Sequence, residues 1–164
     1  MPEQQPQIQY RPAQSYVAIP EVVTMQGLPG VVDHDIPELF GWLASRSVAP
    51  AGPPFIRYLH VEMDAELRIE LGVPVDVEPR VDGRIRSGTL QAGRYLTLLH
   101  VGPYAGLVQA NAELQRWAQE RGIRWQIDDA SAWGGRVERY LSDPSQERDP
   151  STWKTELAYL IADE

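Results

Sequence analysis

Residues 95–117 read YLTLLHVGPYAGLVQANAELQRW, and this stretch indicates how the whole chain folds. Its first seven residues, 95–101, have the apolar composition of a strand, and Gly102, Pro103 and Tyr104 are typical of a turn. Apolar residues then recur at helical spacing. We therefore predict a strand, a turn and a helix, with one helical face formed by Leu107, Asn111, Leu114, Trp117 and Ala118.

The first half of the chain repeats this order. Residues 16–25 are β-branched and apolar, which predicts a strand with Pro20 at an edge or a bulge, and 27–30 predicts a turn. A helix is expected behind Asp35 as its cap, with Pro37 in its first turn and Ile36, Leu39, Phe40 and Leu43 on one face. Gly27 to Trp42 and Gly102 to Trp117 are both fifteen positions apart.

Each predicted helix is followed by two strands, 55–63 and 66–73 in the first half, 137–141 and 156–161 in the second. The motif Arg-Tyr-Leu occurs at 57–59 and 139–141, and Glu-Leu at 66–67 and 156–157. We interpret the chain as two β-α-β-β copies, about 15–78 and 88–162, within one α+β domain over 15–164. Residues 1–14 are expected to be a flexible tail, and 74–94 a connection that can add an edge strand.

In each copy the single helix covers only part of the sheet. The two copies can bury the remaining apolar surface by packing side by side about a pseudo-twofold axis. This arrangement predicts one antiparallel sheet with the helices on one side and a central ligand cleft between the copies.

Composition excludes several kinds of chemistry. The 164 residues include no cysteine, so disulfides, thiol nucleophiles and iron–sulfur clusters are excluded. A net charge of −8 argues against direct nucleic-acid binding. No apolar run is long enough to span a membrane, and no signal-peptide core is present, so a cytoplasmic protein is expected.

The two copies differ at one chemically important position. Tyr58 and Tyr140 are equivalent, but two residues earlier, on the same strand face, one copy has Ile56 and the other Glu138. If that face points into the cleft, Glu138 is a buried carboxylate that needs a partner. The alternatives are a solvated strand face, or an ion pair between Glu138 and a neighbour such as Arg136.

Aromatic residues surround Glu138 in the sequence and predict a site for an apolar, planar or cationic ligand. Trp42 and Trp117 are instead expected in the core. His60, Glu62 and Asp64 alternate as metal ligands would, yet a solvated face explains them better, so no metal and no cofactor are expected. The predicted ligand-binding residues are Glu138, Tyr140, Trp133, Tyr104, Tyr58, Phe55 and Trp125.

Four segments together resemble the GyrI-like small-molecule-binding domain, over about residues 16–162. They are His-Val-Gly-Pro-Tyr-Ala-Gly-Leu at 100–107, Trp-Gly-Gly-Arg-Val-Glu-Arg-Tyr-Leu-Ser-Asp-Pro at 133–144, Thr-Glu-Leu at 155–157 and Glu-Leu-Gly-Val-Pro-Val at 70–75. The resemblance implies a tandem pair of β-α-β-β units with a ligand cleft between them. Members of this family include effector domains of AraC-type and MerR-type regulators, stand-alone proteins and an inhibitor of DNA gyrase.

The resemblance also implies a role for the glutamate. Drug-sensing members bind lipophilic cations in an aromatic pocket whose glutamate corresponds by motif position to Glu138. Similar stand-alone members hydrolyse cyclopropane-bearing DNA alkylators with the pocket carboxylate and aromatics. Only about fifteen residues precede the first predicted strand, so we expect a protein without the DNA-binding domain of the regulators.

Three functions are therefore considered. The first is a stand-alone module that senses or sequesters an apolar aromatic ligand, neutral or cationic. The second is a hydrolase of strained electrophiles, with Glu138 activating water and Tyr104 donating a hydrogen bond. The third is an interaction protein that binds gyrase or a regulator, and it ranks lowest because the acidic residues form no long run.

Overall fold

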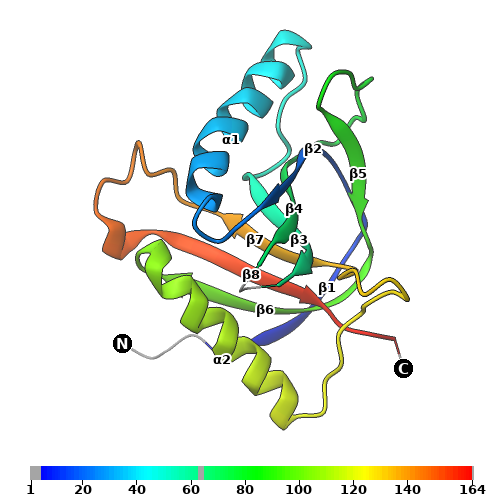
Figure 1. Ribbon diagram of the computed structural model, residues 1–164, viewed down its shortest axis with the longest axis vertical. Helices are drawn as coiled ribbons and strands as arrows, with labels where there is room; N and C mark the ends of the chain where they lie inside the picture. Colours follow the sequence, from blue (N-terminus) through cyan, green and yellow to red (C-terminus); the bar gives the residue numbers. More distant parts are fainter. Residues whose placement is uncertain (1–4, 63–64, 164) are drawn as a thin grey trace.

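The computed structural model describes residues 5–62 and 65–163 and contains eight strands in one antiparallel sheet. The sheet is curled, and two long helices, α1 and α2, accompany it (Figure 1). The predicted α+β class is confirmed. In chain order the elements are β1 Gln7–Arg11, β2 Gln14–Val23, α1 Leu28–Ser45, β3 Phe55–Val61, β4 Leu67–Pro74, β5 Arg86–Leu90, β6 Gly93–Val101, the 3-10 turn Tyr104–Gly106, α2 Leu107–Glu120, β7 Arg136–Tyr140, the 3-10 turn Pro150–Thr152 and β8 Lys154–Leu160.

The sheet is symmetric about its central pair of strands. Its order is β1-β6-β8-β7-β3-β4-β2-β5, so β6-α2-β7-β8 and β2-α1-β3-β4 occupy mirrored places, each with an additional edge strand. At the centre, Ile56 of β3 lies directly opposite Glu138 of β7. The two positions that distinguish the copies therefore meet on the pseudo-twofold axis itself.

The register corrects one detail of the predicted repeat. Arg57 lies opposite Glu70, and Arg139 lies opposite Glu156. Both pairs are close, with 3.9 Å between Arg57 Nη1 and Glu70 Oε1 and 2.8 Å between Arg139 Nη1 and Glu156 Oε1. The counterpart of Glu156 is thus Glu70. Matching it with Glu66 was wrong by four positions, because the pair Glu-Leu occurs at 66–67 and again at 70–71.

The predicted flexible tail is wrong for residues 7–11, which form β1 and pair with β6. Almost all of β1 is exposed, and an edge strand that buries neither face has no alternating apolar pattern to detect. Backbone hydrogen bonds and an ion pair of Arg11 with Glu156, 2.9 Å apart, hold it in place. The edge strand expected within 74–94 is confirmed as β5, and Pro20 lies in β2 beyond the residues that pair with β5.

Helix α1 begins earlier than predicted. It starts at Leu28, with Pro29 in its first turn, whereas Asp35 and Pro37 were expected to form its beginning. Asp35 lies inside the helix with a side chain that is only 1% exposed. The cap assignment is wrong because Pro29 already suits a helix start, and the Asp-Pro pattern eight residues later repeats that signal.

A charged cluster surrounds Asp35 and joins α1 to β2 and to the segment before β5. His34 Nδ1 and Arg84 Nη2 lie 2.8 and 2.9 Å from Asp35 Oδ1. Burial alone would raise the pKa of Asp35, but hydrogen bonds from Glu21, His34 and Arg84 outweigh it and lower that pKa. The spacing of three of these residues would suit a metal ion: His34, Asp35 and Glu38. Arg84, which also contacts Glu38, already provides a positive charge there.

The same cluster predicts a pH-dependent stability. Hydrogen bonding to Asp35, burial and the negative charge of Asp35 raise the pKa of Glu21 to about 7. A raised pKa stabilises the fold at low pH, and this stabilisation is lost as pH rises from the unfolded value near 4.5 through about 7. We expect the urea midpoint to fall between pH 5 and pH 8, and Glu21→Gln to remove most of that slope. An unchanged slope in the variant would contradict this assignment.

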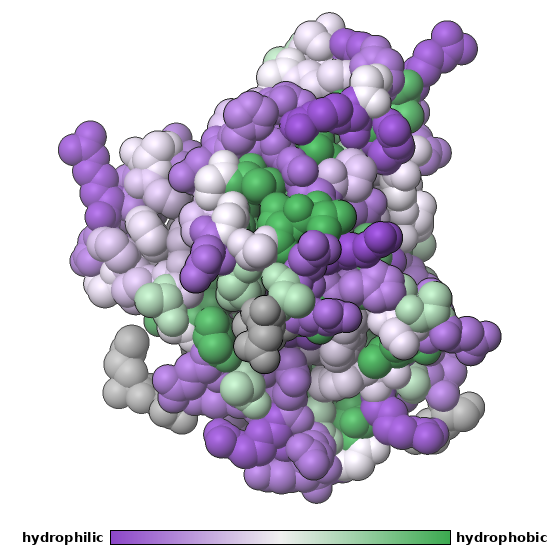
Figure 2. Space-filling model, in the orientation of Figure 1, coloured by the Kyte–Doolittle hydropathy of each residue, from purple (hydrophilic) through white to green (hydrophobic). Residues whose placement is uncertain are grey.

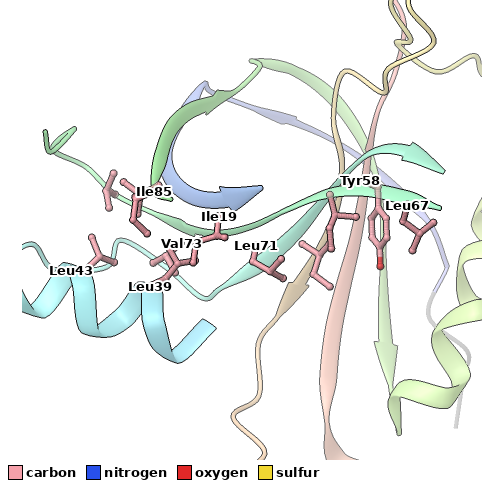
Figure 3. Close-up of a cluster of buried hydrophobic side chains, with 12 residues drawn as sticks. Ile19, Leu39, Leu43, Tyr58, Leu67, Leu71, Val73 and Ile85 are labelled. Atoms are coloured by element: carbon pink, nitrogen blue, oxygen red, sulfur yellow. The ribbon is translucent and has the colours of Figure 1, made fainter. Parts of the chain in front are cut away.

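Both helices cover the same face of the sheet. Across six strands, one row of directly opposed residues faces them, in the order Leu98, Leu157, Glu138, Ile56, Leu71 and Ile19. Leu39 and Leu43 of α1 pack over β2 and β4, and Tyr58 lies beside Leu67 in the part of this cluster that is distant from Leu39 and Leu43 (Figure 3). Leu107 and Leu114 of α2 pack similarly over β6 and β8. Five aliphatic residues and one glutamate thus form the central row of the core.

Candidate functional site

Glu138 is the chemical centre of the helix-covered face. Its side chain is buried, with 7% of the residue exposed. Oε1 accepts hydrogen bonds from the hydroxyls of Tyr58 at 3.0 Å and Tyr140 at 2.9 Å, and Oε2 accepts one from Asn111 Nδ2 at 3.1 Å. Of the ion pairs among the described residues, none includes Glu138. The alternatives of a solvated strand face and of an ion pair with Arg136 are therefore wrong.

The donors around Glu138 are neutral. Burial, followed by the negative charge of Glu138, raises the pKa of Tyr58 and of Tyr140 well above the ordinary value. Both phenols therefore keep their protons at neutral pH and donate hydrogen bonds to the carboxylate. Three neutral hydrogen bonds satisfy its geometry but do not cancel its charge, so a bound cation would find an electrostatic complement here.

Asn111 reaches Glu138 from α2 and is held in one orientation. The hydroxyl of Tyr159 donates to Asn111 Oδ1 at 2.6 Å, and Gln115 Nε2 donates to that hydroxyl at 3.1 Å. Because Oδ1 accepts from Tyr159, the Nδ2 group is directed toward Glu138. Asn111 was expected on the buried helical face but was not predicted as a site residue. A single amide on an otherwise apolar stripe was the signal that could have identified it.

Aromatic rings extend from Glu138 along α2 and β8. Trp125 and Trp133 lie with ring centroids 6.3 Å apart, and Tyr159 is 5.0 Å from Trp125 and 5.6 Å from Trp133. The backbone N–H of Trp133 donates to the carbonyl of Leu59 at 2.9 Å, which fixes the loop before β7 against β3. Tyr159 was not predicted as a site residue.

The structure brings six of the seven predicted site residues to the helix-covered side. Tyr104 contacts Tyr140 edge-on, with centroids 5.6 Å apart, and is 37% exposed. Phe55 is not brought to this site. It precedes Ile56 on the same strand and so points to the opposite face, where it packs on Tyr16 with centroids 5.2 Å apart. The prediction of Phe55 as a wall needs this correction.

Trp42 and Trp117 are partly buried and pack against the two helix-covered clusters, as predicted. Of the alternating residues His60, Glu62 and Asp64, the last lies outside the described residues. On the opposite face of the sheet, a cavity of about 200 Å³ is lined by residues that include Phe55, Tyr95 and Arg139. Arg139 lines this cavity, and consecutive side chains of a strand point to opposite faces of the sheet. Glu138 therefore points away from the cavity.

One face of the molecule has a mixed surface. Viewed from the side that shows both helices, hydrophobic atoms reach the surface in patches near the middle of the molecule, within a largely hydrophilic surround (Figure 2). Tyr104 and Val108, at the start of α2, are exposed large hydrophobic residues, at 37% and 58%. The aromatic region near Glu138 thus lies next to exposed apolar side chains.

The sequence matches the GyrI-like small-molecule-binding domain over residues 4–161. This chain belongs to that family. A comparison with curated protein sequences gave no match.

Four solved structures have a similar fold. The EcmrR C-terminal domain superimposes with a TM-score of 0.79 at 18% identity, covering 98% of this chain and 99% of that one. In the EcmrR–DNA complex, with a TM-score of 0.80 and 17% identity, this GyrI-like chain spans 58% of the longer protein. A hydrolase from Listeria innocua gives 0.64 at 19% identity, covering 99% and 94%. SAV2435 bound to tetraphenylphosphonium gives 0.62 at 14% identity, covering 96% and 94%.

Within the described residues, neither helix is long and apolar enough to cross a membrane.

Proposed function

We propose that this protein senses or sequesters an apolar aromatic ligand, neutral or cationic, at the helix-covered face around Glu138. The observation that carries the proposal is the buried carboxylate, which has three neutral donors and, among the described residues, no ion pair. Fully burying an unbalanced charge is costly, and a protein retains such a group where a ligand supplies the opposite charge. The proposal includes no direct contact with nucleic acid and keeps the expected cytoplasmic location.

The aromatic residues support a planar or ring-bearing ligand. Trp125, Trp133 and Tyr159 offer ring faces and edges on one side of Glu138, and Tyr104 and Tyr140 offer them on the other. A lipophilic cation gains from ring faces and from the carboxylate together. The similar fold of SAV2435, which binds tetraphenylphosphonium, makes that cation a suitable first probe.

Titration with tetraphenylphosphonium tests the proposal. The chain has five tryptophans, and Trp125 and Trp133 border the proposed site. We expect saturable quenching of tryptophan fluorescence with one ligand per chain, confirmed by calorimetry. The matched control is Trp42→Phe on α1, which should leave the quenching amplitude largely intact, whereas Trp133→Phe should reduce it. Absence of saturable binding by both methods, for the cation and for neutral triphenyl compounds, would contradict the proposal.

A hydrolase at the same carboxylate is the second candidate, and the hydrogen bonds to Glu138 favour it specifically. A carboxylate fixed by Tyr58 and Tyr140 can accept a proton from water while the water oxygen forms a bond to a carbon of a strained three-membered ring. The ring C–C bond breaks, its electron pair goes to the electron-withdrawing group of the substrate, and that group takes up the proton from Glu138. Tyr104, adjacent to Tyr140, was expected to donate a hydrogen bond to the electrophile. The fold is similar to that of the hydrolase from Listeria innocua.

Turnover distinguishes the two functions. We expect that a cyclopropane-bearing electrophile incubated in 50-fold excess gives no more than one equivalent of hydrolysed product above the uncatalysed background, because the rings and the carboxylate suffice for binding. Chromatography of the products over time measures this. Multiple turnovers that Glu138→Gln abolishes would overturn the binding function in favour of hydrolysis. An interaction with gyrase rests on the negative charge alone, and an unaffected supercoiling reaction at large excess of protein would exclude it.

A further inference from the structure

The aromatic residues beside Glu138 already surround a cation that belongs to the chain. The guanidinium carbon of Arg136 lies 4.7 Å from the ring centroid of Trp133, 4.9 Å from that of Tyr159 and 5.5 Å from that of Tyr58. We call these three rings the Arg136 cage. Arg136 precedes Glu138 by two residues on β7, so both side chains point to the helix-covered face.

Arg136 is held there by ring faces rather than by a carboxylate. Among the described residues, no ion pair includes Arg136. Its Nε is buried and has no hydrogen-bond partner. The other arginines of the sheet centre behave differently, since Arg57 and Arg139 lie opposite glutamates and pair with them. An arginine whose buried donor is unsatisfied, beside a carboxylate without an ion pair, is not in its most favourable arrangement.

We infer that Arg136 determines which ligands the Glu138 site accepts, because its guanidinium occupies the position in the cage that a ligand cation would take. The inference rests on the proposed function. Any aromatic ligand must displace the Arg136 side chain from the rings. A lipophilic cation is in addition repelled by the positive charge of Arg136, whereas a neutral aromatic ligand is not. The chain is thereby biased toward neutral apolar ligands and binds cations more weakly than the carboxylate alone would allow.

Arg136→Met tests this inference. Methionine retains an unbranched apolar stem like that of arginine but lacks the charge and the planar hydrogen-bond donors of the guanidinium. We expect the variant to bind tetraphenylphosphonium at least tenfold more tightly than the unsubstituted protein, and a neutral triphenyl compound by a clearly smaller factor. Arg136→Lys, which keeps the charge, should bind the cation about as weakly as the unsubstituted protein.

A matched control removes a similar arginine–tryptophan contact elsewhere. Arg121 stacks on Trp117 at the end of α2, with 3.8 Å between the guanidinium carbon and the ring centroid. Arg121→Met should change neither affinity. If Arg136 were only structural, Arg136→Met would lower the melting temperature and weaken or leave unchanged the affinity for both ligands, and either result overturns the inference.

The outcomes separate this inference from the proposed function. If the unsubstituted protein binds the cation and Arg136→Met binds it no more tightly, the inference fails and the function stands. If only Arg136→Met binds the cation and the unsubstituted protein binds the neutral triphenyl compound, both stand, with Arg136 as the barrier to the cation. If neither protein binds any of the aromatic probes, the function fails and the inference fails with it.

Discussion

Replacing Glu138 by glutamine should weaken the binding of tetraphenylphosphonium at least tenfold, which corresponds to about 1.4 kcal/mol. Glutamine has nearly the same shape and can still accept from a tyrosine hydroxyl, but it carries no charge. The carboxylate is buried and is accompanied by neutral donors, so its attraction for a cation is weakly screened. A neutral triphenyl compound of similar size should lose less than threefold. Calorimetric titration of both ligands measures the difference.

The stability of the same variant provides the control. Because Glu138 has no ion pair within the part of the chain that the structure describes, removing its charge relieves a desolvation cost, and we expect Glu138→Gln to melt at the same temperature as the unsubstituted protein or higher. Glu156→Gln is the matched comparison, since it breaks contacts with Arg11 and Arg139 and should lower the melting temperature. Equal losses for cationic and neutral ligands in Glu138→Gln would contradict the electrostatic role.

The largest loss of stability is expected when the asymmetry between the two halves is removed. Ile56 is 1% exposed and lies directly opposite Glu138 across β3 and β7. Ile56→Glu would place a second carboxylate there without a donor and against a like charge. Uncompensated buried charges typically cost ~3–5 kcal/mol, so the variant should lose a large part of its stability at pH 7.5. Urea unfolding followed by circular dichroism measures this loss.

The pH dependence of that variant shows its cause. Burial and the adjacent Glu138 would raise the pKa of the introduced carboxyl, so its protonation at pH 5 should restore a substantial part of the lost stability. Ile56→Leu keeps an aliphatic side chain and should cost less than about 1.5 kcal/mol at both pH values. A loss in Ile56→Glu that does not shrink at pH 5 would mean that packing, and not charge, limits this position.

Much of the fold could be predicted because its signals are periodic and repeated. The spacing of apolar residues around Leu114 and Leu39 predicted both helices, and the Arg-Tyr-Leu motif predicted the paired strands at the centre. The edge strand β1 could not be found in this way, since its side chains are exposed and only its backbone is bonded. The start of α1 was misplaced because two prolines, Pro29 and Pro37, carry the same helix-start signal.

The site could be predicted where the comparison of the copies was informative. The difference between Ile56 and Glu138 at equivalent positions identified the carboxylate. The tyrosines that donate to Glu138 lie on the same strand face, as the alternation of side chains along the strands predicts. Arg136 and Asn111 have roles that depend on distances between elements far apart in the sequence. No local pattern shows that a helix residue reaches a strand residue, or that an arginine stacks on three rings instead of pairing with a glutamate.

A crystal structure of the protein with tetraphenylphosphonium would test the central claim most directly. The account predicts one cation per chain on the helix-covered face, in contact with Glu138 and the rings of Trp133 and Tyr159, with the Arg136 side chain moved out of its cage. Binding instead in the cavity on the opposite face, beside Phe55 and Tyr95, with Glu138 and Arg136 unchanged, would contradict it.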